Sequence, residues 1–169
     1  MPGSLDLVVE FPASVEQVHA AFSDEHYWLA RLAAFGGSTT LDSLIVDADG
    51  AVIVATTQHL SRHALPRVVA KAVPVDLQVL RKETWRSIGG HRVSGEVIVS
   101  APGGLGAGRA DALLAPTRDG SRLRFTATIE VKVPLVGGKI ETYITEQLAE
   151  QIHTMQRFTT AWINGNDRY

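Results

Sequence analysis

The chain contains no cysteine among its 169 residues. This absence excludes disulfide bonds, thiolate zinc sites and thiol catalysis, and it fits a reducing compartment. No apolar run approaches the roughly 20 residues that a membrane-spanning helix needs. The start, MPGSLD, lacks the basic region of a signal peptide. We therefore expect a soluble, cytoplasmic protein.

Common catalytic and phosphate-binding motifs are missing as well. Neither GxSxG nor SxxK occurs, so serine acyl chemistry has no support. The glycine-rich stretch 103–108 does not meet GxGxxG spacing, which favours a hairpin loop over a phosphate site. His59 and His63 have the spacing of a helical metal pair, but they fall where a strand is expected to end and no HExxH glutamate lies between them. We expect no metal and no cofactor.

Composition indicates one globular domain, residues 1–169. Hydrophobic residues make up 45% of the chain and charged residues 20%. The net charge is only −2, but residues 1–50 hold eight acids against Arg31 alone, whereas residues 51–92 hold seven bases against two acids. This balance argues against a nucleic-acid partner. The charges either mix into a neutral surface on folding or leave a local basic surface for an anionic headgroup or an acidic ligand.

Hydrophobic periodicity predicts a strand, two short helices, a run of strands and a long helix. Residues 5–11 alternate as a half-buried strand does, and Ser14 is the expected N-cap of the first helix. Trp28, Leu32 and Phe35 recur at helical spacing in the second helix. Six further strands are expected at 41–46, 51–60, 77–86, 91–100, 107–115 and 122–133. Their short connections favour an antiparallel meander.

An amphipathic helix is expected to interrupt this meander over residues 64–73. Apolar residues recur there at helical spacing, while Arg67 and Lys71 lie on the opposite face. Pro66 suits a first helical turn, and Pro74 ends the run. We interpret this segment as part of a lid.

The last helix is expected over residues 138–164, a length of roughly 40 Å at 1.5 Å per residue. Its apolar face comprises Ile140, Ile144, Leu148, Met155, Phe158 and Trp162. Gln151 falls in the middle of this face, and Gln147 lies at its edge. Because a buried glutamine needs hydrogen-bond partners, each is either a satisfied core amide or a polar contact for a ligand.

Strand 77–86 has no face that is apolar throughout. Arg81, Glu83 and Trp85 share one face with Leu77 and Val79. Burying an unpaired charge costs several kcal/mol, so an inward pair should be mutually bonded or reach water in a cavity. The alternative is a bulge, or a strand end at the mouth, where both charges reach solvent.

Three stretches carry a resemblance to a known superfamily: FPASVEQVHAAFSD at 11–24, ETW at 83–85 and VPLVGGKIE at 133–141. With the order of elements, they resemble the START-like (SRPBCC) superfamily, and within it the mainly actinobacterial domain-of-unknown-function family 2505. The resemblance implies an α+β helix-grip fold, in which a curved antiparallel sheet of about seven strands surrounds a long C-terminal helix and a cavity. It carries over no catalytic residue.

Our first hypothesis is a carrier for a hydrophobic or amphipathic small molecule, lipid-like or polyketide-like, held between sheet and helix. The candidate lining residues are Arg81, Glu83, Trp85, Gln147, Gln151 and Met155. Arg67 and Lys71 would contact a headgroup or an anionic membrane surface. The second hypothesis is a cyclase- or hydrolase-like enzyme with Arg81 and Glu83 as polarising and acid/base groups. A third is an interaction module whose interior is filled by side chains.

Overall fold

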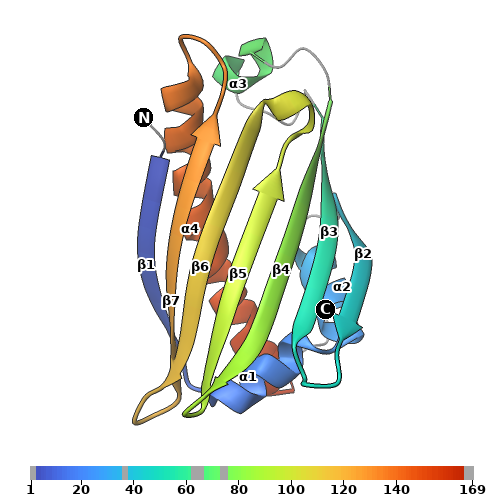
Figure 1. Ribbon diagram of the computed structural model, residues 1–169, viewed down its shortest axis with the longest axis vertical. Coiled ribbons are helices and arrows are strands. Elements are labelled where there is room, and N and C mark those ends of the chain that lie inside the picture. The colour runs from blue at the N-terminus through green and yellow to red at the C-terminus, as the bar shows by residue number, and fades with distance from the viewer. Residues whose placement is uncertain (1–2, 36–37, 62–66, 73–75, 166–169) are drawn as a thin grey trace.

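The computed structural model describes residues 3–35, 38–61, 67–72 and 76–165. Within these residues, seven strands form one antiparallel sheet in the order β1-β7-β6-β5-β4-β3-β2 (Figure 1). The strands are β1 (Gly3–Phe11), β2 (Thr39–Val46), β3 (Val52–Leu60), β4 (Leu77–Gly89), β5 (Arg92–Ser100), β6 (Gly106–Pro116) and β7 (Ser121–Val131). The helices are α1 (Val15–Phe22), α2 (Glu25–Ala34), α3 (Arg67–Ala72), the short 3-10 helix η2 (Pro102–Gly104) and α4 (Gly137–Ile163). The expected fold class is confirmed.

Helices α1 and α2 begin at side-chain caps. The Ser14 hydroxyl accepts from the Gln17 amide at 3.1 Å, and the Gln17 side chain accepts from the Ser14 amide at 2.9 Å. This reciprocal capping box satisfies two backbone donors at the N-terminus of α1. Asp24 caps α2 by accepting from the His26 amide at 2.9 Å. The expected N-cap at Ser14 is therefore confirmed.

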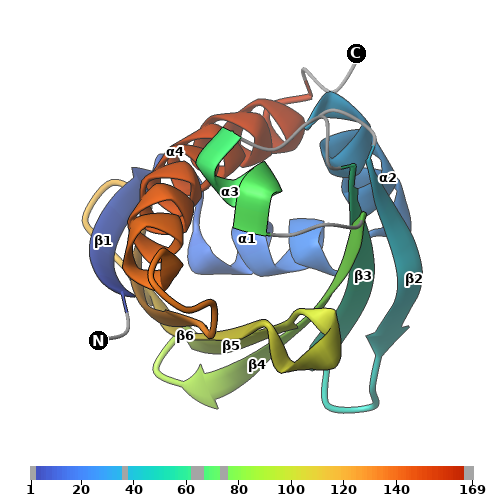
Figure 2. The ribbon, with the colours of Figure 1, turned by 90° about the horizontal axis from the view of Figure 1, so that it is seen from above.

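The sheet curves around α4, which lies along β1 and β7 (Figure 2). The Gln156 side chain donates to the backbone carbonyl of Glu10 at 2.8 Å, which ties α4 to β1. A Cβ on Gly3 would stand only 3.1 Å from the Thr145 hydroxyl, so the strand and the helix approach closely there. The helix therefore covers one side of the concave face.

Two separate apolar clusters fill the concave side. The larger lies near α1 and α2 and contains the aromatic side chains Phe22, Tyr27, Trp28 and Trp85. The smaller lies at the opposite end of the sheet, around Leu77 and Ile140. Arg81 and Glu83 lie on β4 between Leu77 and Trp85, and therefore between the two clusters.

The expected apolar face of α4 does pack into the core, with Ile140, Met155 and Phe158 buried and Ile144, Leu148 and Trp162 half-buried. The buried side chains of α4 also include Glu141, Ile152 and Thr159. The expectation of a buried Gln151 in the middle of the apolar face is wrong, because Gln151 is exposed, and Gln147 is half-buried. The reason is the position of α4 over β1 and β7, which turns the side carrying Glu141 and Ile152 toward the sheet.

Candidate functional site

The concave face of β4 keeps an unbroken alternation through the candidate site. Its register with β3 runs without a shift from the pair Val52 and Trp85 to the pair Leu60 and Leu77. There is therefore no bulge at Arg81 or Glu83, and both residues share the inward face with Trp85. Of the two alternatives that the sequence left open, the structure has the inward, mutually bonded pair.

Glu83 is a buried carboxylate with both oxygens bonded. Only 4% of the residue is exposed. The Nε of Arg81 donates to its Oε2 at 3.0 Å, and the indole Nε1 of Trp85 donates to its Oε1 at 3.1 Å. Burial by itself acts to raise the pKa of Glu83, but the charges of Arg81 and Arg31, with the hydrogen bonds from Trp85 and Arg81, hold the pKa below the ordinary value. Glu83 is therefore an ionised anchor inside the protein.

Arg81 engages Glu83 with only part of its guanidinium group. Its side chain is 27% exposed, against 5% for that of Glu83. Among the described residues, no group accepts a hydrogen bond from the two terminal nitrogens of Arg81. Because a guanidinium group offers five N–H donors in a planar fork, the pair with Glu83 orients Arg81 and leaves its outer donors available.

A second polar group joins α2 to α4. The Tyr27 hydroxyl is hydrogen-bonded to the Thr159 hydroxyl at 2.6 Å, and Arg31 donates to the Tyr27 hydroxyl at 3.4 Å. Tyr27 is fully buried, and that burial raises the pKa of its hydroxyl. The guanidinium of Arg31 also lies 4.5 Å from the ring of Trp28. Arg31 thus contacts the aromatic cluster, and its positive charge also acts to lower the pKa of Glu83.

Sequence reasoning missed this second group. Tyr27 and Arg31 are four residues apart on α2 and hence share a helix face, which was an available signal. Thr159 carried no such signal, because it lies 132 positions from Tyr27 in the chain. Only the packing of α2 against α4 brings the two hydroxyls together.

The concave face of β6 carries small side chains along most of its length. The inward positions of β6 carry no large side chain until Leu114; they are Gly106, Gly108, Ala110 and Ala112. Along α4, Ile140 and Met155 are buried, but Ile144 and Leu148 between them are only half-buried. The half-buried Ile144 packs against the cluster of Leu77 and Ile140, and the half-buried Leu148 packs against the larger cluster.

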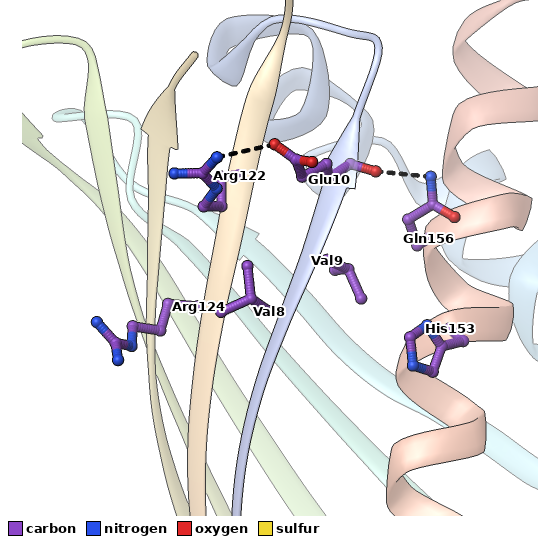
Figure 3. Close-up of a pocket in the computed structure, with 7 residues that line it drawn as sticks. All are labelled: Val8, Val9, Glu10, Arg122, Arg124, His153 and Gln156. Carbon is purple, nitrogen blue, oxygen red and sulfur yellow. Dashed lines mark hydrogen bonds and ion pairs between the residues drawn. The ribbon is translucent and has the colours of Figure 1, made fainter.

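Two hollows lie among the described residues, both away from Arg81. The first, of about 660 Å³, lies between β1, β7 and α4 (Figure 3). Its lining is Val8, Val9, Glu10, Arg122, Arg124, His153 and Gln156. Arg122 is already paired there with Glu10 at 3.0 Å. The second, of about 610 Å³, lies where β3, β4 and β5 approach Pro102. Neither includes Arg81, Glu83 or Trp85.

The remaining sequence candidates fall as follows. Arg67 and Lys71 are exposed on α3, which forms residues 67–72 of the helix expected at 64–73; the flanking positions lie outside the described residues. His63 also lies outside them. In the part of the chain that the structure describes, no three metal-ligating side chains come together. No helix there is long and apolar enough to cross a membrane.

A curved antiparallel sheet closed by a long C-terminal helix defines the START-like, helix-grip class of proteins. The structure of a START superfamily protein from Mycobacterium smegmatis superposes with a TM-score of 0.55 at 11% identity, covering 96% of this chain and 98% of that one. Protein TTHA0849 from Thermus thermophilus superposes with a TM-score of 0.53 at 16% identity, covering 98% of both chains. Likeness at these identities establishes the fold.

The chain belongs to the family described as protein of unknown function (DUF2505), which matches residues 6–163. Its relatives include Rv0481c of Mycobacterium tuberculosis and Mb0491c of Mycobacterium bovis, both named as uncharacterized proteins. Each is 39% identical over 175 residues, which cover 98% of this chain and 99% of the relative. The family resemblance that the sequence motifs indicated is thereby confirmed.

Proposed function

We propose that this protein binds a hydrophobic or amphipathic small molecule, lipid-like or polyketide-like, between the concave face of the sheet and α4. One observation carries the proposal: the partly exposed Arg81 lies on the concave face between the two apolar clusters, where β6 carries only glycine and alanine at its inward positions before Leu114. A mostly apolar lining with a small number of placed polar groups is typical of sites for small molecules.

Arg81 is the polar anchor of this proposed site. Its terminal nitrogens have no acceptor among the described residues, and Glu83 fixes the orientation of the guanidinium group. A planar fork of N–H donors matches an oxygen-rich group such as a carboxylate or a phosphate. The proposed ligand therefore has an apolar body and one acceptor group, which places it in the amphipathic class.

The other candidate lining residues take more limited parts in this proposal. Trp85 is 4% exposed and packs its ring 5.0 Å from that of Phe22, so it forms the floor beneath the anchor. Met155 is buried among the same core residues and supplies an adaptable apolar wall. Gln147, which is half-buried, is the proposed polar contact at the edge of the α4 face, whereas the exposed Gln151 takes no part in the proposed site.

The alternative enzyme function, a cyclase- or hydrolase-like reaction in the same space, is less well supported. A carboxylate whose pKa is held below the ordinary value is a poor general base near neutral pH. Both oxygens of Glu83 are also occupied by donors of the protein. Arg81 could polarise a carbonyl, but the described residues place no acid/base group beside it that is free to exchange a proton.

The position of α3 supports a lid that also contacts an anionic surface. Its exposed Arg67 and Lys71 would meet phosphate groups of a membrane while the ligand enters or leaves. Reversing both charges, by Arg67→Glu and Lys71→Glu, should weaken binding to phosphatidylserine vesicles and leave binding to neutral vesicles unchanged. Equal binding to the anionic vesicles would remove this part of the proposal.

Native mass spectrometry of the freshly purified protein tests the proposed function. The mass is compared with that of the denatured chain, and a fluorescent polyene fatty acid and its methyl ester serve as added probes. We expect a bound small molecule, or displacement by the probes, and tighter binding of the acid than of the ester. A native mass equal to that of the bare chain, together with no binding of either probe, would overturn the proposal.

Variants at Arg81 and Glu83 test the polar anchor separately from the apolar part of the site. Arg81→Gln should remove the preference for the acid over the ester. The double variant Arg81→Gln with Glu83→Gln should do the same without leaving an unpaired buried charge. Arg109→Gln is the matched control, because Arg109 pairs with Glu96 on the opposite, exposed face. If the wild type bound the acid and the ester with equal affinity, Arg81 would not be the polar anchor. The proposal of an apolar ligand site would be unaffected.

A further inference from the structure

The loop between β7 and α4, residues 132–136, presents a leucine entirely to solvent. Leu135 is 104% exposed, whereas the next most exposed large hydrophobic side chain among the described residues, that of Leu80, reaches 54%. Pro134 beside it is exposed as well. A leucine side chain that is exposed to this degree contributes nothing to the packing of the core.

The exposure of Leu135 does not come from a loose loop. The Val131 amide donates to the buried Glu141 carboxylate at 2.8 Å, and the Lys132 amide donates to the Leu105 carbonyl at 2.8 Å. A Cβ on Gly137 would stand 2.7 Å from the Val131 carbonyl, so the two ends of the loop are pressed together. The base of the loop is braced, and the tip is held out from it.

The backbone at Leu135 is strained. Its φ of 71° lies in the left-handed region, which residues other than glycine, asparagine and aspartate seldom adopt. Such strain persists only where the surrounding structure imposes it, and it concentrates at functional positions. Here the contacts at the two ends of the loop impose the strained backbone, and the Leu135 side chain points into solvent.

Basic side chains flank this tip. Lys132 and Lys139 are exposed on either side of it, and no acidic residue occurs between them. Lys132 has only a distant partner, Glu130 at 3.9 Å. Helix α3, which carries the exposed Arg67 and Lys71, lies at the same end of the molecule as this loop (Figure 1). An apolar point surrounded by positive charge complements an anionic membrane surface.

We propose that the β7–α4 loop docks this protein on anionic membranes, with Leu135 inserted among the acyl chains and Lys132 and Lys139 against the headgroups. A second copy of the chain is the less suitable occupant. One leucine and one proline cover too little area for a stable protein interface, and a symmetric contact would bring the lysines of both copies together. The proposal is independent of the ligand site.

Leu135→Gly tests it, because glycine removes the side chain and adopts the left-handed backbone without strain. Folding is therefore not at risk. In co-sedimentation with phosphatidylserine-containing vesicles, we expect this variant to bind at least about fivefold more weakly, the cost of losing one inserted leucine. Ile98→Thr is the control on the convex face, where Ile98 is 46% exposed, and it should bind as the wild type does.

Leu135→Trp supplies a direct readout. Its added tryptophan fluorescence should shift to the blue on anionic vesicles and be quenched by brominated acyl chains. Wild-type-like vesicle binding by Leu135→Gly, or no wild-type binding at all, would overturn the proposal. A concentration-dependent dimer that Leu135→Gly abolishes would overturn it in favour of a second copy. Ligand occupancy in native mass spectrometry should be the same in Leu135→Gly as in the wild type, so failure of the docking proposal leaves the ligand site intact. An absence of wild-type vesicle binding would also remove the membrane contact proposed for α3.

Discussion

Arg81 and Glu83, two residues apart on β4, form an ion pair on the concave face of the sheet, with Nε and Oε2 3.0 Å apart. Glu83 is buried and Arg81 is partly exposed. Both oxygens of Glu83 are hydrogen-bonded within the protein, whereas the terminal nitrogens of Arg81 have no acceptor among the described residues. This asymmetry distinguishes the pair from the surface ion pairs of the convex face, and it leads to the first two predictions.

Glu83→Gln should lower the free energy of unfolding by about 1–3 kcal/mol, because the carboxamide cannot accept from both Arg81 and Trp85. Urea denaturation measures the loss. The matched control is Glu96→Gln, which breaks the exposed pair with Arg109. That change should cost no more than about 1 kcal/mol, and equal losses in the two variants would contradict the role assigned to Glu83.

The pH dependence of stability follows from the lowered pKa of Glu83. A carboxyl with a depressed pKa in the folded state stabilises the fold above its unfolded pKa, near 4.5, and loses that contribution as pH falls through the folded value. The difference in unfolding free energy between wild type and Glu83→Gln should therefore be full at pH 7 and shrink on acidification below pH 4.5. Urea titrations across this range measure it. A difference that does not change with pH would show that Glu83 is not ionised.

Tyr27→Phe should destabilise the fold by about 1 kcal/mol, since it leaves the buried Thr159 hydroxyl without its partner. The raised pKa of Tyr27 gives a second readout. In alkaline titration followed by absorbance, this hydroxyl should ionise only as the protein unfolds, and that late step should disappear in Tyr27→Phe. Tyr143→Phe, at a half-buried position, should retain the late step.

Gly95→Ala should destabilise the protein by about 1–3 kcal/mol or more through overpacking. A Cβ at this position would stand 2.3 Å from Cζ3 of the buried Trp85 ring. Denaturation and the tryptophan emission spectrum measure the effect. Gly138→Ala is the control, because nothing lies within 4 Å of its added Cβ, and alanine favours the helix there. An unperturbed Gly95→Ala would mean that Trp85 does not pack on β5 as described.

Gly108→Leu should weaken ligand binding about tenfold or more, because the new side chain would extend from the inward face of β6 into the proposed ligand site. The first carbon itself fits, since a Cβ there meets its neighbours at 3.7 Å or more. Probe titration measures binding, and urea denaturation checks the fold. Leu113→Met, on the opposite face of β6, is the control and should leave binding unchanged. Undiminished binding by a stable Gly108→Leu would place the ligand elsewhere.

The elements of the fold could be predicted because their signals are local. The Ser14 cap, the alternation of β1 and β7 and the helical period of α4 are set by backbone sterics and by burial of one face. The position of Gln151 could not be predicted in this way. Its exposure depends on the rotation of α4 about its own axis, which the contacts with β1 and β7 decide.

The sequence by itself determined the order of strands and helices, the family and the shared face of Arg81, Glu83 and Trp85, because a strand alternates its side chains with a period of two. The sequence left open whether that face points inward, and the unbroken register of β4 decided it. Only the tertiary structure decided that this pair is bonded, that Arg31 lies in its field, and that Tyr27 meets Thr159. These relationships join α2, β4 and α4, and their distances depend on how those elements pack. The exposure of Leu135 was also decided by the tertiary structure. The contacts at the base of its loop hold that side chain in solvent, and no local propensity predicts this.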